Sequence, residues 1–187
     1  MISTAALLLL GASAIAGQDP APPTAQVSAQ VKVSIGDTAA PPEWELSIPV
    51  GLNVLYGTEA GRVTMELRYP AKALNYVKIK ATEKLKDAGY DVKAGKPVVT
   101  GETATIALEF LPASASAKTL PSGTTAILVF KVAVTAPEKT FPITVENIRA
   151  WGPRPAAATL TAASARAATF IVTPPGLPIL SCFFYMH

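Results

Sequence analysis

Apolar and polar residues alternate along short stretches of the chain between residues 25 and 173. The clearest stretch is residues 62–69, whose apolar positions are Val63, Met65, Leu67 and Tyr69 and whose polar positions are Arg62, Thr64, Glu66 and Arg68. Side chains of a strand point alternately to its two faces, so this pattern predicts a half-buried strand. Pro70 has no N–H to donate to a sheet, and we expect the strand to end near Tyr69.

The same pattern recurs at near-regular spacing. It predicts further strands at residues 27–35, 44–54, 74–80, 90–94, 103–110, 125–134, 141–151, 156–162 and 166–172. We expect the last two to form a closing hairpin, and Pro49 to mark a sheet edge or a bulge. Residues 82–89 suggest one short helix, capped by Thr82 and stopped at Gly89. With no helix long enough to connect parallel strands, the chain is predicted to be all-β, an antiparallel β-sandwich of nine or so strands.

The apolar positions of these strands predict a core between two sheets. We expect it to contain Val31, Val33, Leu46, Ile48, Met65, Leu67, Ile79, Ile106, Leu108, Phe110, Phe130, Val132, Ile143 and Val145. The chain has a single cysteine, Cys182, so no internal disulfide can form and this core must hold the fold together.

The two ends of the chain differ from the patterned region. Residues 1–16 contain an apolar run and an A-x-A pattern, which indicate a secretory signal peptide, with a buried apolar segment as the alternative. Residues 17–24 are a Pro/Ala-rich leader, 25–173 are the sandwich domain, and 174–187 are an apolar C-terminal tail too short to span a membrane. For the tail, the alternatives are an extra strand laid on the domain, a misread gene end or a truncated anchor. From the signal peptide we expect a secreted protein that is extracellular or at the cell surface.

Groups that could perform catalysis or bind a metal are scarce. The only histidine, His187, is the last residue, which argues against a catalytic triad and against a His/Cys metal site. No D-x-D-x-D loop suggests calcium. The carboxylates that could form a hydrolytic pair lie at outward or turn positions, where a solvated carboxylate is the ordinary case: Glu43, Glu45, Glu66, Glu102 and Glu109. We expect no catalysis, no cofactor and no metal, and rank a small extracellular hydrolase last among the functions.

The order of four segments resembles the cohesin domain family. They are "SIGDTAAPPEWELSIPVGLNV", "VTMELRYPAKALNYVKI", "LPSGTTAILVFKVAV" and "FPITVENIRAW". The resemblance covers residues 27–172 and implies a jelly-roll sandwich of nine strands. It also implies a non-catalytic module that binds a dockerin-like or other protein partner, in scaffolding or adhesion linked to polysaccharide degradation. Where the family has "YDP", this chain has "YP" at Tyr69 and Pro70, so the bend there is expected to be reshaped.

The resemblance also implies kinship with carbohydrate-binding modules, so a polysaccharide ligand is the alternative to a protein partner. Sugar binding requires a row of exposed aromatic rings. Alternation turns Trp44, Tyr69 and Tyr90 inward or places them at strand ends, and leaves Trp151 and Tyr76 freer to face outward. Residues 62–96 are rich in lysine and arginine, but a solvated basic face is favoured over nucleic-acid binding.

In the family, the partner docks on one sheet, which the resemblance assigns here to residues 62–69, 90–94, 103–110 and 125–134. The outward residues of these strands are the candidate partner-binding residues: Arg62, Thr64, Glu66, Arg68, Thr105, Ala107, Glu109, Ile127, Val129 and Lys131. Ile127 and Val129 would form an apolar centre ringed by charges, or else a second, minor core under a loop or tail. Dockerin-binding members of the family place Asn and Asp early in the strand that corresponds to residues 62–69. This chain has Arg62 and Thr64 there, so we expect a protein partner other than a standard dockerin.

Overall fold

Two β-sheets pack face to face in the computed structural model, which describes residues 29–114, 116–153 and 159–175. The five-stranded sheet has the order β12 (Ala162–Ser164), β1 (Val31–Ile35), β3 (Glu45–Val54), β9 (Gly123–Val132) and β5 (Leu74–Ala81). The eight-stranded sheet has the order β2 (Thr38–Ala40), β13 (Ala168–Val172), β10 (Thr140–Trp151), β4 (Arg62–Pro70), β8 (Thr103–Pro112) and β6 (Tyr90–Ala94), with β11 (Thr159–Leu160) beside β10 and β7 (Val98–Thr100) beside β8. The predicted all-β sandwich is confirmed.

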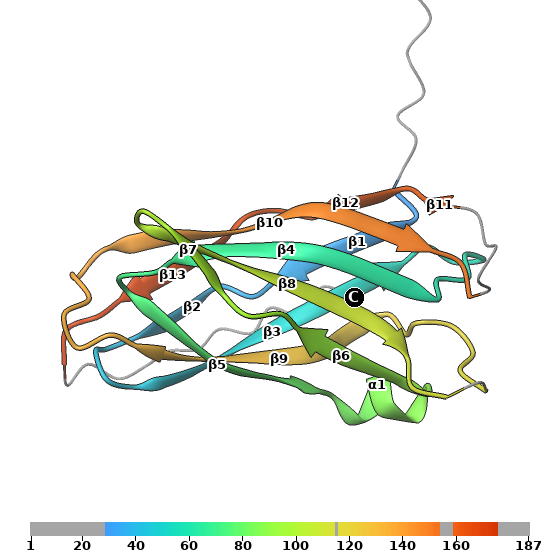
Figure 1. The fold of residues 1–187 in the computed structure, drawn as a ribbon, viewed down its shortest axis with the longest axis horizontal. Coiled ribbons are helices and arrows are strands. Elements are labelled where there is room, and N and C mark those ends of the chain that lie inside the picture. Colours follow the sequence, from blue (N-terminus) through green and yellow to red (C-terminus); the bar gives the residue numbers. More distant parts are fainter. Residues whose placement is uncertain (1–28, 115, 154–158, 176–187) are drawn as a thin grey trace, which may run out of the picture.

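Figure 1 shows β10, β4, β8 and β6 running across the molecule, with β1 and β3 behind them. The helix α1 (Glu83–Asp87) lies at one end of the sandwich, against β6 and β9. Among the residues that the structure describes, no helix is long and apolar enough to span a membrane.

The core lies between the two sheets, where the alternation placed it. Every predicted core residue is buried except Ile79, which is partly buried because β5 is the edge strand of its sheet. The ring of Tyr69 on β4 meets the ring of Phe130 on β9 edge-on, with 4.9 Å between their centroids. Because β4 and β9 belong to different sheets, this aromatic contact joins the two layers.

Two local predictions are confirmed by backbone geometry. The hydroxyl of Thr82 accepts a hydrogen bond from the N–H of Leu85 at 3.4 Å. Leu85 lies in the middle of the short helix, and its side chain is fully buried. Gly89 follows the helix with φ +82°, the left-handed conformation that glycine adopts most easily. The predicted cap and stop are therefore both present.

Pro49 lies inside its sheet, between β1 and β9, and so does not mark a sheet edge. The ladder with β1 ends at Ile35, and the N–H of Gly36 donates to the carbonyl of Pro49 at 3.0 Å. A Cβ on Gly36 would lie 2.7 Å from Cγ of Pro49, so only glycine leaves room for the proline ring. A register shift follows directly at Val50 and Gly51, which confirms the bulge that Pro49 suggested.

The predicted closing hairpin does not form. β12 pairs in parallel with β1, whereas β13 pairs with β10 and, in parallel, with β2. Asp37, in the turn between β1 and β2, explains the separation, because its carboxylate accepts a hydrogen bond from the N–H of Thr169 at 2.8 Å and pairs with Arg166. These contacts hold the loop between β12 and β13 where β1 passes to β2, so the two final strands enter different sheets. The sheets are therefore not purely antiparallel.

Several predicted segments lie outside the described residues. They are the signal peptide, the leader, most of the apolar tail with Cys182 and His187, and Val27. The two short strands β2 and β7 were not predicted, because three-residue strands are too short for alternation to be recognised.

Candidate functional site

The outward side chains of β10, β4, β8 and β6 form one continuous surface, called here the β4 face. Its residues are Arg62, Thr64, Glu66 and Arg68 from β4; Thr105, Ala107 and Glu109 from β8; Asp91 and Lys93 from β6; and Thr144, Glu146, Asn147, Arg149 and Trp151 from β10. The strand register places Arg149, Thr64, Glu109 and Lys93 in one cross-strand row. Directly opposite residues of neighbouring strands are close enough to interact, so each row acts as a unit.

Seven of the candidate partner-binding residues lie together on the β4 face, namely Arg62, Thr64, Glu66, Arg68, Thr105, Ala107 and Glu109. The three candidates from β9 do not, so their predicted placement in the same sheet as β4 is wrong. Ile127, Val129 and Lys131 point outward from the five-stranded sheet, on the opposite side of the sandwich. β9 pairs with β3 and β5, and the strand that lies beside β4 opposite β8 is β10. Val129 is also only 4% exposed.

Ion pairs and hydrogen bonds fix several side chains of the β4 face. Arg62 binds Glu109, with 2.8 Å from Nε to Oε1, and its guanidinium lies 5.3 Å from the ring centre of Trp151. Arg68 pairs with Glu146 at 3.1 Å. Bidentate or stacked arginines lose less rotamer freedom on binding than free lysines do, so this surface is largely pre-organised.

Asn147 and Glu66 add a hydrogen bond in the middle of the face, where the amide Nδ2 donates to Oε2 at 2.7 Å. Asn147 has φ +51° and lies in a bulge between Glu146 and Arg149. Asparagine tolerates this left-handed conformation better than most residues, and the bulge turns its amide toward β4.

Two cations of the β4 face have no ion-pair partner among the residues that the structure describes, Arg149 and Lys93. Both border a shallow depression of about 830 Å³, whose lining also includes the small residues Thr64, Gly95 and Ala107. The lining also contains two carboxylates, Glu66 and Glu109, against the three cations Arg62, Arg149 and Lys93. A depression with short side chains and this small excess of positive charge can receive protruding side chains of a partner, and it favours acidic ones.

The residues of β10 on this face were missed by the sequence prediction, because β10 was not expected beside β4. One signal was available in the spacing of its apolar residues. Val145 and Ile148 are three positions apart, where strict alternation would give two, and this offset marks the bulge. Only Trp151 had been expected to face outward, and it does so while partly covered by Arg62.

Exposed aromatic residues do not form a row in the part of the chain that the structure describes. Trp44 is 56% exposed, contrary to the prediction, because β3 begins only at Glu45 and the turn before it contains Glu43 with φ +71°. Tyr56 is fully exposed, but it follows the opposite end of β3. Tyr76, expected to be freer to face outward, is partly buried against the core and meets Phe130 edge-on at 5.8 Å. The geometry therefore gives no support to the carbohydrate-binding alternative.

The carboxylates form no reactive cluster in the described part of the chain: Glu66 and Glu146 lie opposite one another, but Glu66 accepts from Asn147 and Glu146 is paired with Arg68. Within residues 29–114, 116–153 and 159–175, no group of three His, Cys, Asp or Glu side chains could hold a metal ion. Glu102 is hydrogen-bonded to Lys72 at 3.0 Å, and this bond and the lysine charge hold the pKa of the carboxyl below its ordinary value. A general acid would need the opposite shift, so Glu102 is unsuited to that role.

Several solved structures share this fold. The sixth cohesin of scaffoldin B from Acetivibrio cellulolyticus, in complex with a mutant Cel5 dockerin, matches 76% of this chain and 99% of its own at 13% identity, with a TM-score of 0.61. The seventh ScaB type I cohesin from Pseudobacteroides cellulosolvens matches 84% of this chain and 98% of its own at 17% identity, with a TM-score of 0.62. A non-cellulosomal cohesin from the archaeon Archaeoglobus fulgidus matches 79% of this chain and 94% of its own at 16% identity, with a TM-score of 0.56.

The shared fold of these structures is the jelly-roll β-sandwich, so the predicted fold class is confirmed, although the predicted count of nine strands is not. No curated protein matches the chain. The family model described as cohesin domain matches residues 31–154, more than half of the sequence. The chain therefore belongs to the cohesin domain family.

Proposed function

We propose that this chain is a non-catalytic recognition module that binds a protein partner through the β4 face. The carrying observation is the depression on that face, which combines short side chains with Arg149 and Lys93, two cations that have no ion-pair partner within the described residues. One of the arginines that line it, Arg62, is held by Glu109, so this part of the surface requires little ordering on binding. Cohesin domains are non-catalytic protein-binding modules, which is consistent with the scarcity of reactive groups described above.

The partner is proposed to be a protein other than a standard dockerin. Similar cohesins have been solved in complex with dockerins, which supports a protein partner in general. Here the first outward residue of β4, Arg62, is already bound to Glu109 and covers Trp151. An arginine held in this way presents a different surface from the Asn and Asp that the resemblance leads one to expect at the start of this strand.

We also propose that the protein acts outside the cell, in scaffolding or adhesion linked to polysaccharide degradation. The signal-peptide pattern of residues 1–16 supports export. The archaeal relative is described as non-cellulosomal, so a role outside a cellulosome is compatible with the family.

The proposal can be tested by capture with the immobilised full chain from the secreted proteins of the source organism. An Ala107→Arg variant places a long side chain at an exposed position beside the depression. An Asn53→Arg variant places the same side chain on the outer surface of the other sheet and is the control. We expect one protein to be captured by the wild type and the control but not by Ala107→Arg.

Equal capture by all three forms would refute the assignment of the β4 face. The dockerin specificity is tested separately with the purified wild-type Cel5 dockerin, for which we expect no binding in the micromolar range. Tight binding of that dockerin would contradict the proposed specificity and leave the assignment of the face intact.

A further inference from the structure

A groove opens in the eight-stranded sheet where β4 and β10 separate, lined by residues of both strands. Their ladder ends with Arg68 opposite Thr144, and continuing this register would place Pro70 opposite Pro142. Neither proline has an N–H to donate, so the ladder cannot continue. From Thr140 to Ile143, β10 pairs instead with β13, while β4 remains paired with β8 as far as Pro70. The resulting groove has a volume of about 800 Å³.

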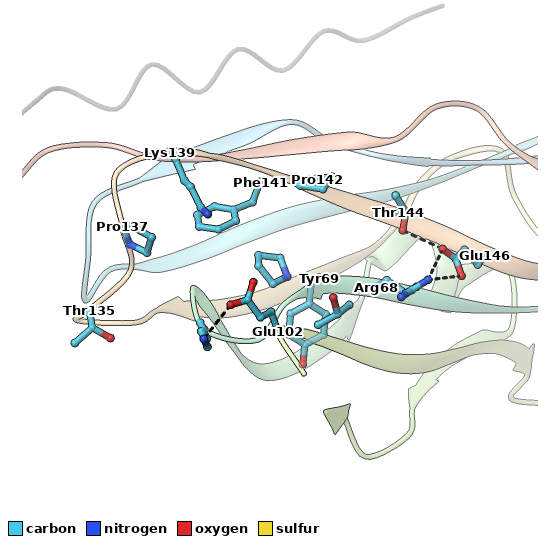
Figure 2. Close-up of a pocket in the computed structure, with 13 residues that line it drawn as sticks. Arg68, Tyr69, Glu102, Thr135, Pro137, Lys139, Phe141, Pro142, Thr144 and Glu146 are labelled. Carbon is cyan, nitrogen blue, oxygen red and sulfur yellow. Dashed lines mark hydrogen bonds and ion pairs between the residues drawn. The ribbon is translucent and has the colours of Figure 1, made fainter. Parts of the chain in front are cut away.

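The walls of the groove are mainly apolar and come from both sides of the separation. Figure 2 shows Phe141 and Pro142 of β10 on one side and Tyr69 of β4 on the other. Pro137, from the loop before β10, closes one end. Phe141 stacks on the buried Phe170 at 6.2 Å between centroids, so its ring is held in place by the core. The ring of Phe141 therefore needs little ordering before an apolar side chain can bind.

Among the charged side chains that line the groove, Lys139 is the cation without an ion pair to a described residue. Arg68 is paired with Glu146, and Lys72 with Glu102. Lys139 forms no ion pair with any residue that the structure describes, and its Nζ lies 4.9 Å from the ring centre of Phe141. Lysine carries three donors, and a contact with an aromatic face leaves donors for an anion.

The groove is continuous with the β4 face, because Arg68, Thr144 and Glu146 belong to both. We infer that the groove binds an extended segment of the partner protein, in which an apolar side chain stands next to a carboxylate. The apolar side chain contacts Phe141 and Pro142, and the carboxylate binds the ammonium of Lys139. This inference rests on the proposed function, and it adds the chemical character of one segment of the partner.

An acidic polysaccharide fits the groove less well than a peptide does. A sugar ring stacks on the open face of an aromatic ring. The face of Phe141 is partly occupied, because Lys139 lies over the ring and Phe170 packs against it in a displaced stack. A branched aliphatic side chain needs only the ring edge and the proline rings.

The inference is tested with a probe peptide, acetyl-Gly-Ser-Leu-Asp-Ser-Gly-amide, and the isotope-labelled full chain. Amide shifts in a ¹H–¹⁵N spectrum are expected at Lys139, Phe141 and Thr103, which line the groove, and not at Asn53. Replacing Asp by Asn in the peptide, or Leu by Ser, should weaken binding about tenfold, as expected for the loss of one charge-assisted hydrogen bond or one buried side chain. A Lys139→Glu variant should lose binding, whereas Lys32→Glu, on the outer side of the other sheet, should keep it.

Equal binding of the Asn peptide, shifts elsewhere on the surface, or binding of an oligogalacturonate but not of the peptide would each overturn the inference. The captured partner separates the two proposals. If Ala107→Arg abolishes capture and Lys139→Glu leaves the affinity unchanged, the groove assignment fails and the β4 face stands. If Ala107→Arg has no effect, the proposed function fails, while the peptide experiment still reports on the groove.

Discussion

Shortening Leu67 to alanine is expected to destabilise the domain strongly, because this side chain lies at the centre of the sandwich. Leu67 is completely buried, on a strand that is paired on both sides. Its direct neighbours on those strands, Ile106 and Val145, are buried as well. Strands held in this way cannot close readily around a cavity, so the loss belongs in the upper part of the range for such substitutions, about 3–5 kcal/mol.

The measurement is urea unfolding of the full chain, followed by tryptophan fluorescence, with thermal unfolding as a second probe. The midpoint temperature should fall by roughly 6–20 °C, the shift that such a loss produces in a domain of this size. Glu66→Ala is the matched control, because Glu66 is the preceding residue and points to the opposite face, where it binds Asn147. Its removal should cost about 0.5–1.5 kcal/mol, the contribution of one hydrogen bond.

The ratio of the two losses tests the register of β4. If Leu67→Ala costs less than about half a kcal/mol, a value typical of surface positions, and Glu66→Ala costs more, then the strand is placed one residue out of register. The outward residues assigned to β4, Arg62, Thr64, Glu66 and Arg68, would then point into the core.

Two further predictions concern contacts that fix the ends of strands. Partial burial opposes ionisation of Asp37, but hydrogen bonds from Thr169 and the ion pair with Arg166 outweigh it and lower the pKa of the carboxyl. This stabilisation is present above the ordinary pKa of about 4 and is lost as the pH falls through the folded value. Melting temperatures measured between neutral and strongly acidic pH should therefore fall more steeply in the wild type than in Asp37→Asn, and equal slopes would contradict the assignment. Gly61→Ala should lower the free energy of unfolding in urea by about 1–3 kcal/mol, because its Cβ would overlap the backbone of Pro153. Gly95→Ala is the control and should be nearly neutral, because its Cβ meets only Ala107 at 3.6 Å. Similar losses in the two variants would show that this packing is wrong.

Local pattern was sufficient to predict which side faces the core for strands without a bulge, such as β4 and β8. Leu67 and Thr64 differ in burial because they lie on opposite faces of one strand, and alternation within a few residues determines this. The caps of the short helix were also predictable, since Thr82 and Gly89 act on their immediate neighbours.

Strand pairing was not predictable in the same way. β9 and β10 are both long, alternating and apolar on one side, and nothing within either sequence says which lies beside β4. The choice depends on contacts between distant residues, such as Tyr69 with Phe130 across the sandwich and Asp37 with Thr169 between loops. The β4 and β8 parts of the candidate site were therefore located correctly, while Ile127 and Val129 were assigned to the wrong sheet.

The central claim is that the β4 face binds a protein, and calorimetric titration of the purified captured partner into the full chain tests it most directly. Wild type and Asn53→Arg should bind with the same affinity. Ala107→Arg should bind about a hundredfold more weakly or worse. The long arginine side chain would occupy the depression that the partner fills in the complex. Its melting temperature should match the wild type, since Ala107 is exposed. Unchanged affinity in Ala107→Arg together with weakened binding in Asn53→Arg would place the interface on the other sheet and contradict the account.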